Sequence, residues 1–234
     1  MKVLLLLIHS PSNIYNQMYL IHQHYIHTFE EVDSFFVVLR ENQVNLVEQE
    51  NDIIYVKGKE HLLNILYKTI TALEYLLQKN NYDFVIRSNI STIIHIPNLL
   101  QYLHRIPNKN IYTSSHFFNL QSLNHKGGIH NSSLFGTNFA RGISIILSTD
   151  TARYLIHHKN KLRYDIVDDV SIGLFFKKFP NLIRYGKQYL SKELTTNSVN
   201  KYTNINNYTF FRNKSTNRMV DIKIMNLIVK KIYT

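Results

Sequence analysis

YDFVIRSNISTIIHIPNLLQYL, residues 82–103, is the stretch that indicates the fold class of this chain. The apolar run at 84–86 predicts a short buried strand, and the polar residues 87–91 follow it directly. Pro97 then begins a predicted helix, because proline is well tolerated at the first helical position. Ligands of open α/β sheets bind beyond the carboxyl ends of the strands. The polar residues after this strand are therefore site candidates.

Predicted strands and helices alternate before this stretch. Apolar runs predict strands at 3–8, 34–39 and 52–56, and helical periodicity predicts helices at 13–29 and 60–78. This alternation predicts parallel strands joined by right-handed crossovers. We therefore expect an α/β fold whose first part, to about residue 113, is a nucleotide-binding half.

The second part of the chain is less regular. We expect short strands at 111–113, 142–147 and 182–185, and an amphipathic helix near the C-terminus that carries Ile224 and Ile228. Residues 114–140 show little periodicity and indicate a long irregular segment. No repeat and no Pro/Gly-rich linker is present, so we predict one domain over 1–234, with an acceptor half at 114–234 that includes a basic C-terminal tail.

Composition indicates a basic globular protein. The chain has 234 residues, 44% hydrophobic and 18% charged, which excludes a disordered protein and allows a sizeable core. Its 27 Lys plus Arg against 16 Asp plus Glu give a net charge of +11. This excess favours a phosphorylated or polyanionic ligand or an anionic membrane surface. The alternative is that an AT-rich genome selects Lys and Asn.

The sequence carries few features that indicate a cellular compartment. The chain has no cysteine, which excludes disulfides and thiolate metal sites. The apolar run at the N-terminus is too short for a signal peptide, and no stretch approaches the roughly 20 apolar residues that span a bilayer. We therefore expect a soluble cytoplasmic protein with no transmembrane segment.

A second polar group is the pair Asp168 and Asp169 in the sequence VDDVSIG, residues 167–173. The pair stands where a helix is predicted to begin, and the helix macrodipole favours a carboxylate there by about 0.3 to 1 kcal/mol. One carboxylate is enough to cap a helix, and adjacent like charges repel, so capping does not account for both. A placed carboxylate can act as a general base in transfer of a phosphate-activated group.

Together these motifs resemble the β1,3-glycosyltransferases of the fringe and β3-galactosyltransferase type. The resemblance rests on the strand with its polar tip, on the Gly142 to Asp150 segment and on VDDVSIG. With the tail residues it is similar to short glycosyltransferases encoded by large DNA viruses, which would place the chain in the host cytoplasm. It implies a GT-A fold, with a Rossmann-like nucleotide half on a central mixed sheet joined to an acceptor half.

The resemblance also implies a reaction and its residues. A sugar would move from a nucleoside-diphosphate sugar, with UDP favoured, to a hydroxyl of a glycan or glycoprotein, with inversion. Asp169, preferred over Asp168, would be the base, and Gly142 and Ser144 would lie near the acceptor. The family's DxD-type metal motif is absent: Asn89 stands at its position, with Ser91 two residues later.

Two explanations of that departure stay open. Mn²⁺ and Mg²⁺ prefer carboxylates and phosphates, so either Asn89 and Ser91 meet the donor, with or without such a metal, or cations replace the metal. The other expected donor-binding residues are His9 and Ser10, at the end of the first strand, and the cations Lys68, Arg87, Arg212, Lys214 and Arg218. The tail that carries the last three would close as a flexible flap over the diphosphate.

Simpler interpretations of these residues exist. Arg87 can pair with a surface carboxylate, Lys68 can be a solvated helix residue, and Asn89 with Ser91 can form a plain turn. Two other functions also remain, a basic nucleic-acid-binding protein and a catalytically inactive carbohydrate-binding relative. No nucleic-acid-binding motif occurs, so we expect no nucleic-acid partner. An inactive relative would not need both Asp168 and Asp169.

Overall fold

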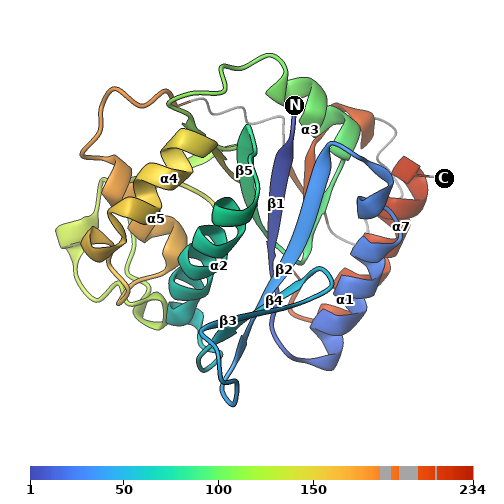
Figure 1. Ribbon diagram of the computed structural model, residues 1–234, viewed down its shortest axis with the longest axis horizontal. Helices are drawn as coiled ribbons and strands as arrows, with labels where there is room; N and C mark the ends of the chain where they lie inside the picture. Colours follow the sequence, from blue (N-terminus) through green and yellow to red (C-terminus); the bar gives the residue numbers. More distant parts are fainter. Residues whose placement is uncertain (185–190, 195–204, 214, 234) are drawn as a thin grey trace.

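The computed structural model describes residues 1–184, 191–194, 205–213 and 215–233. A seven-stranded mixed sheet forms the centre, with helices on both faces (Figure 1). The strand order is β3-β4-β2-β1-β5-β10-β7. The strands are β1 (Val3–Ile8), β2 (Val32–Arg40), β3 (Val47–Glu50), β4 (Ile53–Lys57), β5 (Phe84–Asn89), β7 (Tyr112–Thr113) and β10 (Ile145–Ser148).

The sheet is parallel in its middle and antiparallel toward both edges. β1 pairs in parallel with β2 and with β5, and β2 pairs in parallel with β4. β3 is antiparallel to β4, and β10 is antiparallel to β5 and to β7. β10 comes from the second half of the sequence but lies between two strands of the first half, so both expected halves build one sheet.

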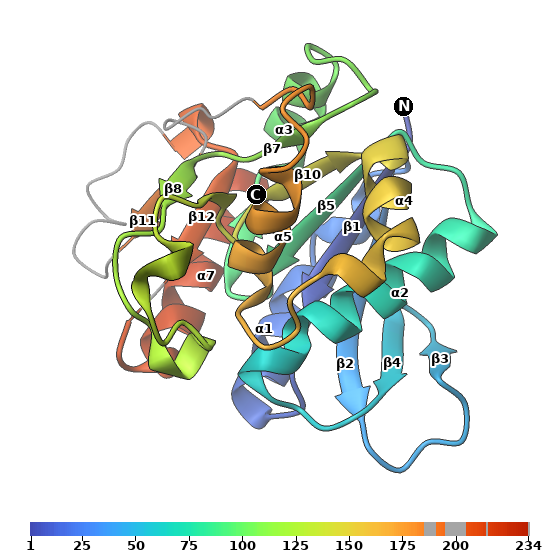
Figure 2. The ribbon, with the colours of Figure 1, turned by 90° about the vertical axis from the view of Figure 1, so that its left-hand side faces the viewer.

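Helices cover the two faces in two groups of three. The described α-helices are α1 (Asn13–Gln23), α2 (Ile65–Lys79), α3 (Ile96–Leu103), α4 (Thr149–His157), α5 (Asp168–Phe176) and α7 (Arg218–Tyr233). α2, α4 and α5 lie on the face turned to the viewer in Figure 2, and α1, α3 and α7 pack on the other. Strand β1 supplies both cores: Leu4 and Leu6 face one group, Leu5 and Leu7 the other. Burial on both faces explains why its sequence is continuously apolar.

Two small sheets complete the fold. β6 (Thr92–Ile94), β12 (Phe210–Asn213) and β11 (Ser191–Leu194) form one, and β8 (Phe117–Asn119) pairs with β9 (Asn138–Ala140) in the other. Short 3-10 turns lie at Ile26–Thr28, Leu62–Asn64, His125–Gly127, Ser132–Leu134, Lys159–Lys161 and Ile205–Asn207. No helix in the described ranges is long and apolar enough to cross a membrane.

The fold confirms the expected α/β class and corrects several boundaries. The first helix ends at Gln23 instead of reaching residue 29, and the second begins at Ile65, after a 3-10 turn. Six short strands, β3, β6, β8, β9, β11 and β12, were not predicted, and β8 and β9 lie in the segment expected to be irregular. Of the strand expected at 182–185, the described residues show a single parallel bridge between Ile183 and Ile111, and residue 185 lies outside them. The tail is not a flexible flap at 210–213, because these residues form β12, which pairs with β6, and Phe210 and Phe211 are buried.

Candidate functional site

The candidate site lies at the carboxyl end of β5. Because β10 is antiparallel to β5, the turn before β10 meets the residues that end β5, with Ile145 opposite Arg87. The first turn of α5 lies at the same end of β5, since Asp168 contacts Arg87. Residues distant in sequence therefore meet at one end of the central strand.

Arg87 is the centre of this site. Its guanidinium forms an ion pair with Asp168, 2.6 Å between Nη2 and Oδ2, and both side chains are buried. Nη1 donates to Oδ1 of Asn89 at 2.8 Å and to the carbonyl oxygen of Gly142. The partner of Arg87 is thus a buried carboxylate, not a surface one.

Gly142 is fitted closely against this guanidinium. A Cβ at this position would collide with Nη1 of Arg87, so a side chain cannot replace the hydrogen without moving the arginine. The backbone N–H of Gly142 points to Oδ2 of Asp169 at 3.4 Å. Gly142 therefore holds the arginine and the second aspartate together through its backbone.

Asp169 has the properties of a general base. Burial raises the pKa of its carboxyl to about 6, the neighbouring Asp168 adds to the rise, and Arg87 opposes it. Oδ1 accepts from the backbone N–H of Val170 at 2.9 Å, and the residue as a whole is partly exposed. A base with a pKa near the working pH is ionised and still able to take a proton.

Helix α5 sets the direction of the two aspartates. Its N-cap is Val167, which supplies no side-chain cap, and both aspartates lie in the first turn, where the macrodipole favours negative charge. Gly173 lets the helix approach β9, since a Cβ there would lie 2.5 Å from Cβ of Phe139 and 2.7 Å from the carbonyl oxygen of Asn138. The glycine of the VDDVSIG motif thus has a packing reason.

The donor set does not fit a divalent metal. Oδ1 of Asn89 accepts from Arg87, and Oγ of Ser91 accepts from Nη1 of Arg212. A divalent cation bound to these two oxygens would lie beside two guanidinium groups. Over the described ranges no cluster of three or more His, Cys, Asp or Glu side chains could hold a metal ion. Mn²⁺ and Mg²⁺ favour carboxylate oxygens, which these two positions lack.

Arg212 enters the site from β12, where it lies opposite Thr92 of β6. Burial, followed by the charges of Arg218 and Arg141, lowers the pKa of its guanidinium to about 10, and Arg87 contributes in the same direction. Arg218 is paired with the buried Asp221 at 2.7 Å. Lys214, the third expected cation of the tail, lies outside the described residues.

Lys68 is fully buried and is not the solvated helix residue that one interpretation expected. Its ammonium donates to the carbonyl oxygen of His9 at 2.6 Å and to both oxygens of Glu60, at 2.8 and 2.9 Å. Glu60 also accepts from the backbone N–H of Leu39 at 2.8 Å and from Ser10 at 3.4 Å. The pair therefore ties the ends of β1 and β2 together, and Lys68 does not present its charge at the surface.

His9 lines a hollow of about 450 Å³ beside the start of α1. Burial and then the charge of Lys68 lower the pKa of the His9 imidazole to about 4, so the ring is neutral at pH 7. It stacks on Tyr19 with 5.9 Å between ring centroids. The other residues around the hollow are Pro11, Ser12, Asn13, Asn16, Val38, Ile53 and Tyr55. A neutral, partly aromatic hollow suits a nucleoside better than a phosphate.

Ser144 is not placed to meet an acceptor. It is fully buried, and its hydroxyl contacts the hydroxyl of Ser114 at 2.9 Å and that of Ser115 at 2.6 Å. Its oxygen also accepts from the backbone N–H of Ser115 at 3.0 Å. These bonds fix the turn before β10, so the expected acceptor contact of the Ser144 side chain is corrected to a structural role.

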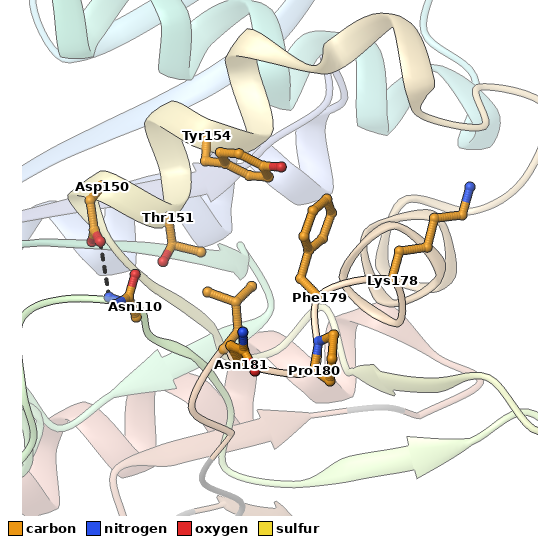
Figure 3. A pocket seen from close by; sticks show the side chains of 9 residues that line it. Asn110, Asp150, Thr151, Tyr154, Lys178, Phe179, Pro180 and Asn181 are labelled. Carbon is orange, nitrogen blue, oxygen red and sulfur yellow. Dashed lines mark hydrogen bonds between the residues drawn. The ribbon is translucent and has the colours of Figure 1, made fainter.

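Another hollow, of about 560 Å³, lies at the opposite end of the strands (Figure 3). The backbone N–H of Asn110 donates to Asp150 there at 3.0 Å, and the rings of Tyr154 and Phe179 stand beside each other. The hollow lies where β7 begins and β10 ends. This is the end of the strands away from Arg87 and Asp169. This hollow is separate from the candidate site.

A family profile described as Galactosyltransferase matches residues 28–180, more than half of the chain. The chain belongs to the galactosyltransferase family. The matched range includes Arg87, Asn89 and both aspartates but ends before Arg212. No curated protein matches the chain in sequence. Family membership confirms a glycosyltransferase enzyme and replaces the nucleic-acid-binding interpretation.

Two solved glycosyltransferase structures are similar to the chain. A glycosyltransferase involved in glycosylation of the major capsid of PBCV-1 is 11% identical, with a TM-score of 0.52, over 97% of this chain and 100% of the other. The galactosyltransferase LgtC, solved with donor and acceptor sugar analogs, is 10% identical with a TM-score of 0.49, over 100% of this chain and 97% of the other. The first likeness supports the GT-A glycosyltransferase fold that the sequence predicted.

Sequence reasoning missed two residues around the site. Glu60 was treated only as the start of a helix, although a carboxylate eight residues before Lys68 was an available partner for that lysine. Arg141 was not singled out, and its guanidinium lies over the ring of Phe118, 4.6 Å from the centroid. The neighbouring Gly142 was the available signal for it.

Proposed function

We propose that this galactosyltransferase-family protein transfers a sugar from a nucleoside-diphosphate sugar, with a UDP-sugar favoured, to a hydroxyl of a glycan or glycoprotein, with inversion. The observation that carries the proposal is Asp169, a partly exposed residue whose carboxyl pKa is raised to about 6 and which shares Gly142 with the buried guanidinium of Arg87. Such a group is suited to remove a proton at neutral pH.

In the proposed reaction the acceptor oxygen bonds to the anomeric carbon while the bond from that carbon to the diphosphate oxygen breaks. The acceptor proton passes to Asp169, and the nucleoside diphosphate leaves with the bonding electrons. Asp168 has a different role, because its ion pair with Arg87 holds the guanidinium next to the base. We therefore name Asp169 the base and Asp168 a positioning residue.

We propose the donor site in residues 1–113 and the acceptor site in 114–234, with the tail returning to the donor. The neutral hollow at His9 suits the nucleoside, and Ser10 with the Lys68–Glu60 pair shapes the strand ends beside it. Backbone and side chains near Gly142 lie next to Asp169 and would face the acceptor. The cysteine-free chain is compatible with the cytoplasm, or host cytoplasm for a viral protein, which we propose as its compartment.

The test is turnover with a panel of UDP- and GDP-sugars, measured as release of the nucleoside diphosphate, with simple glycosides and a glycosylated capsid protein as acceptors. NMR of the product gives the anomeric configuration, and a product with the donor's configuration would refute inversion. Asp169→Asn should lower kcat about 10²- to 10⁴-fold while donor affinity is kept. Full activity of Asp169→Asn would refute the assignment of the base.

The matched control is Asp165→Asn. Asp165 is an exposed carboxylate four residues before Asp169, and its ion partner is Arg163. This variant removes the same charge from the same segment outside the site, so its kcat should equal that of the unmodified protein.

A further inference from the structure

Four arginines come together around Asn89 and Ser91, at the carboxyl end of β5. The charges of Arg87, Arg141 and Arg218 all act on Arg212, and each opposes its positive charge. These arginines come from β5, from the turn before β10, from β12 and from the start of α7. Bringing like charges together costs free energy in the unliganded protein, and an anion that binds among them relieves it.

Two of these arginines form an ion pair with a carboxylate, whereas Arg212 receives only the longer-range negative charge of Asp221. Arg87 is paired with Asp168, and Arg218 is paired with Asp221, which is completely buried. Arg212 donates instead to the neutral hydroxyl of Ser91, and in the part of the chain that the structure describes no carboxylate forms an ion pair with it. Arg212 is partly exposed at the surface of the site.

The residues at the DxD-equivalent position now have an explanation. Asn89 and Ser91 are acceptors for Arg87 and Arg212, so each holds a guanidinium in the place where a carboxylate would hold a metal. An aspartate at either position would pair with the arginine and cancel its charge. The neutral side chains orient the two guanidinium groups and keep their charges available.

We propose that this protein binds the donor diphosphate without a divalent metal, with Arg212 as the direct phosphate ligand and Arg87, Arg141 and Arg218 supplying the surrounding positive potential. The inference rests on the proposed function, because it assumes a nucleoside-diphosphate donor. A guanidinium matches two phosphate oxygens at once and carries a permanent charge, so it can balance the departing diphosphate as an ion would. Arg212 lies beyond the matched range 28–180, so the device is an addition to the part that defines the family.

The experiment is calorimetric titration of the full chain with UDP, GDP and inorganic pyrophosphate, each in EDTA and in excess Mn²⁺. We expect equal affinity in both conditions for at least one nucleotide. Arg212→Gln should weaken that affinity about 10- to 100-fold, the usual effect of losing a charge-assisted hydrogen bond. Arg212→Lys keeps the positive charge but lacks the planar guanidinium that matches two phosphate oxygens. Its nucleotide affinity should therefore lie between those of the unmodified protein and of Arg212→Gln.

Arg105→Gln is the matched control. It removes the same charge from an exposed position after α3. The neighbouring residues His104 and Ile106 line a hollow with Met1 and Asp83, at the end of the strands away from the site. Its nucleotide affinity should equal that of the unmodified protein. Thermal melting of each variant shows whether it is folded.

The outcomes separate the inference from the proposed function. Binding that requires Mn²⁺ would overturn the metal-free site and leave the glycosyltransferase donor in place. Binding in EDTA that Arg212→Gln does not change would overturn the role of Arg212. If neither a nucleotide nor pyrophosphate binds in either condition, the proposed nucleotide-sugar donor itself fails.

Discussion

Replacing Asp169 by asparagine should stabilise the fold while it removes activity. The pKa of this carboxyl rises from 3.8 to about 6 on folding, mainly because burial disfavours its charge. Each tenfold change in proton affinity is worth about 1.4 kcal/mol, so the full rise corresponds to at most about 3 kcal/mol. The residue is partly exposed, so water screens part of the effect, and we expect about 1 to 2 kcal/mol.

The sign follows from proton binding. Between about pH 4 and pH 6 the folded protein binds more protons at Asp169 than the unfolded chain does, so this group lowers stability as the pH rises. Well above pH 6 Asp169 is ionised in both states, and the stability that it costs no longer changes with pH. The asparagine side chain carries no charge at any pH, so Asp169→Asn should match the unmodified protein at pH 4 and exceed it at pH 7.5.

The assay is urea unfolding of both proteins at several pH values from 4 to 8, with Asp165→Asn as control. Arg163 lowers the pKa of Asp165, so that control should not gain stability at neutral pH. Turnover of the unmodified protein should rise with pH through about 6, since the base must lose its proton to act. A constant stability difference between Asp169→Asn and the unmodified protein over this pH range would refute the raised pKa.

Two further substitutions test the supports of the site. Lys68→Met should destabilise the protein by about 3 kcal/mol, the low end for a broken buried ion pair, because Glu60 keeps 21% of its side chain exposed. Adding Glu60→Gln should restore part of that loss in urea unfolding, and no recovery would show that the pair is not the cause. Gly173→Ala should cost about 1 to 3 kcal/mol, since its Cβ would lie 2.5 Å from that of Phe139. An unchanged urea midpoint would contradict that tight packing.

The sequence predicted the elements with strong periodicity. β1 is a continuous apolar run because both faces of the sheet are covered there, and β2, β4 and β5 each contain a shorter apolar run. Helix α2 carries a stripe of leucines. Of the strands that were missed, β3 and β6 show two different reasons. β3 is a partly exposed edge strand with the sequence VEQE, and β6 has only three residues whose partner, β12, lies more than a hundred residues later.

The candidate site was partly visible in the sequence. The polar tip after β5 and the Asp168–Asp169 pair were both recognised as chemistry placed on apolar elements. Their pairing was not recognised, because the ion pair joins Arg87 of β5 to Asp168 of α5, and these two elements lie about 80 residues apart in the sequence. Lys68 and Ser144 were given ligand contacts because sequence does not report burial, and both are fully enclosed.

The sequence by itself determined the α/β class, the alternating order of elements and the chemical groups available for transfer. These follow from local patterns, since periodicity and turn residues act over a few positions. Only the tertiary structure decided which groups meet. Arg212 of the tail contacts Ser91, Asp168 pairs with Arg87, and burial followed by the charge of Asp168 raises the pKa of Asp169. Electrostatic effects depend on distance in space and on burial, and neither is encoded by spacing along the chain.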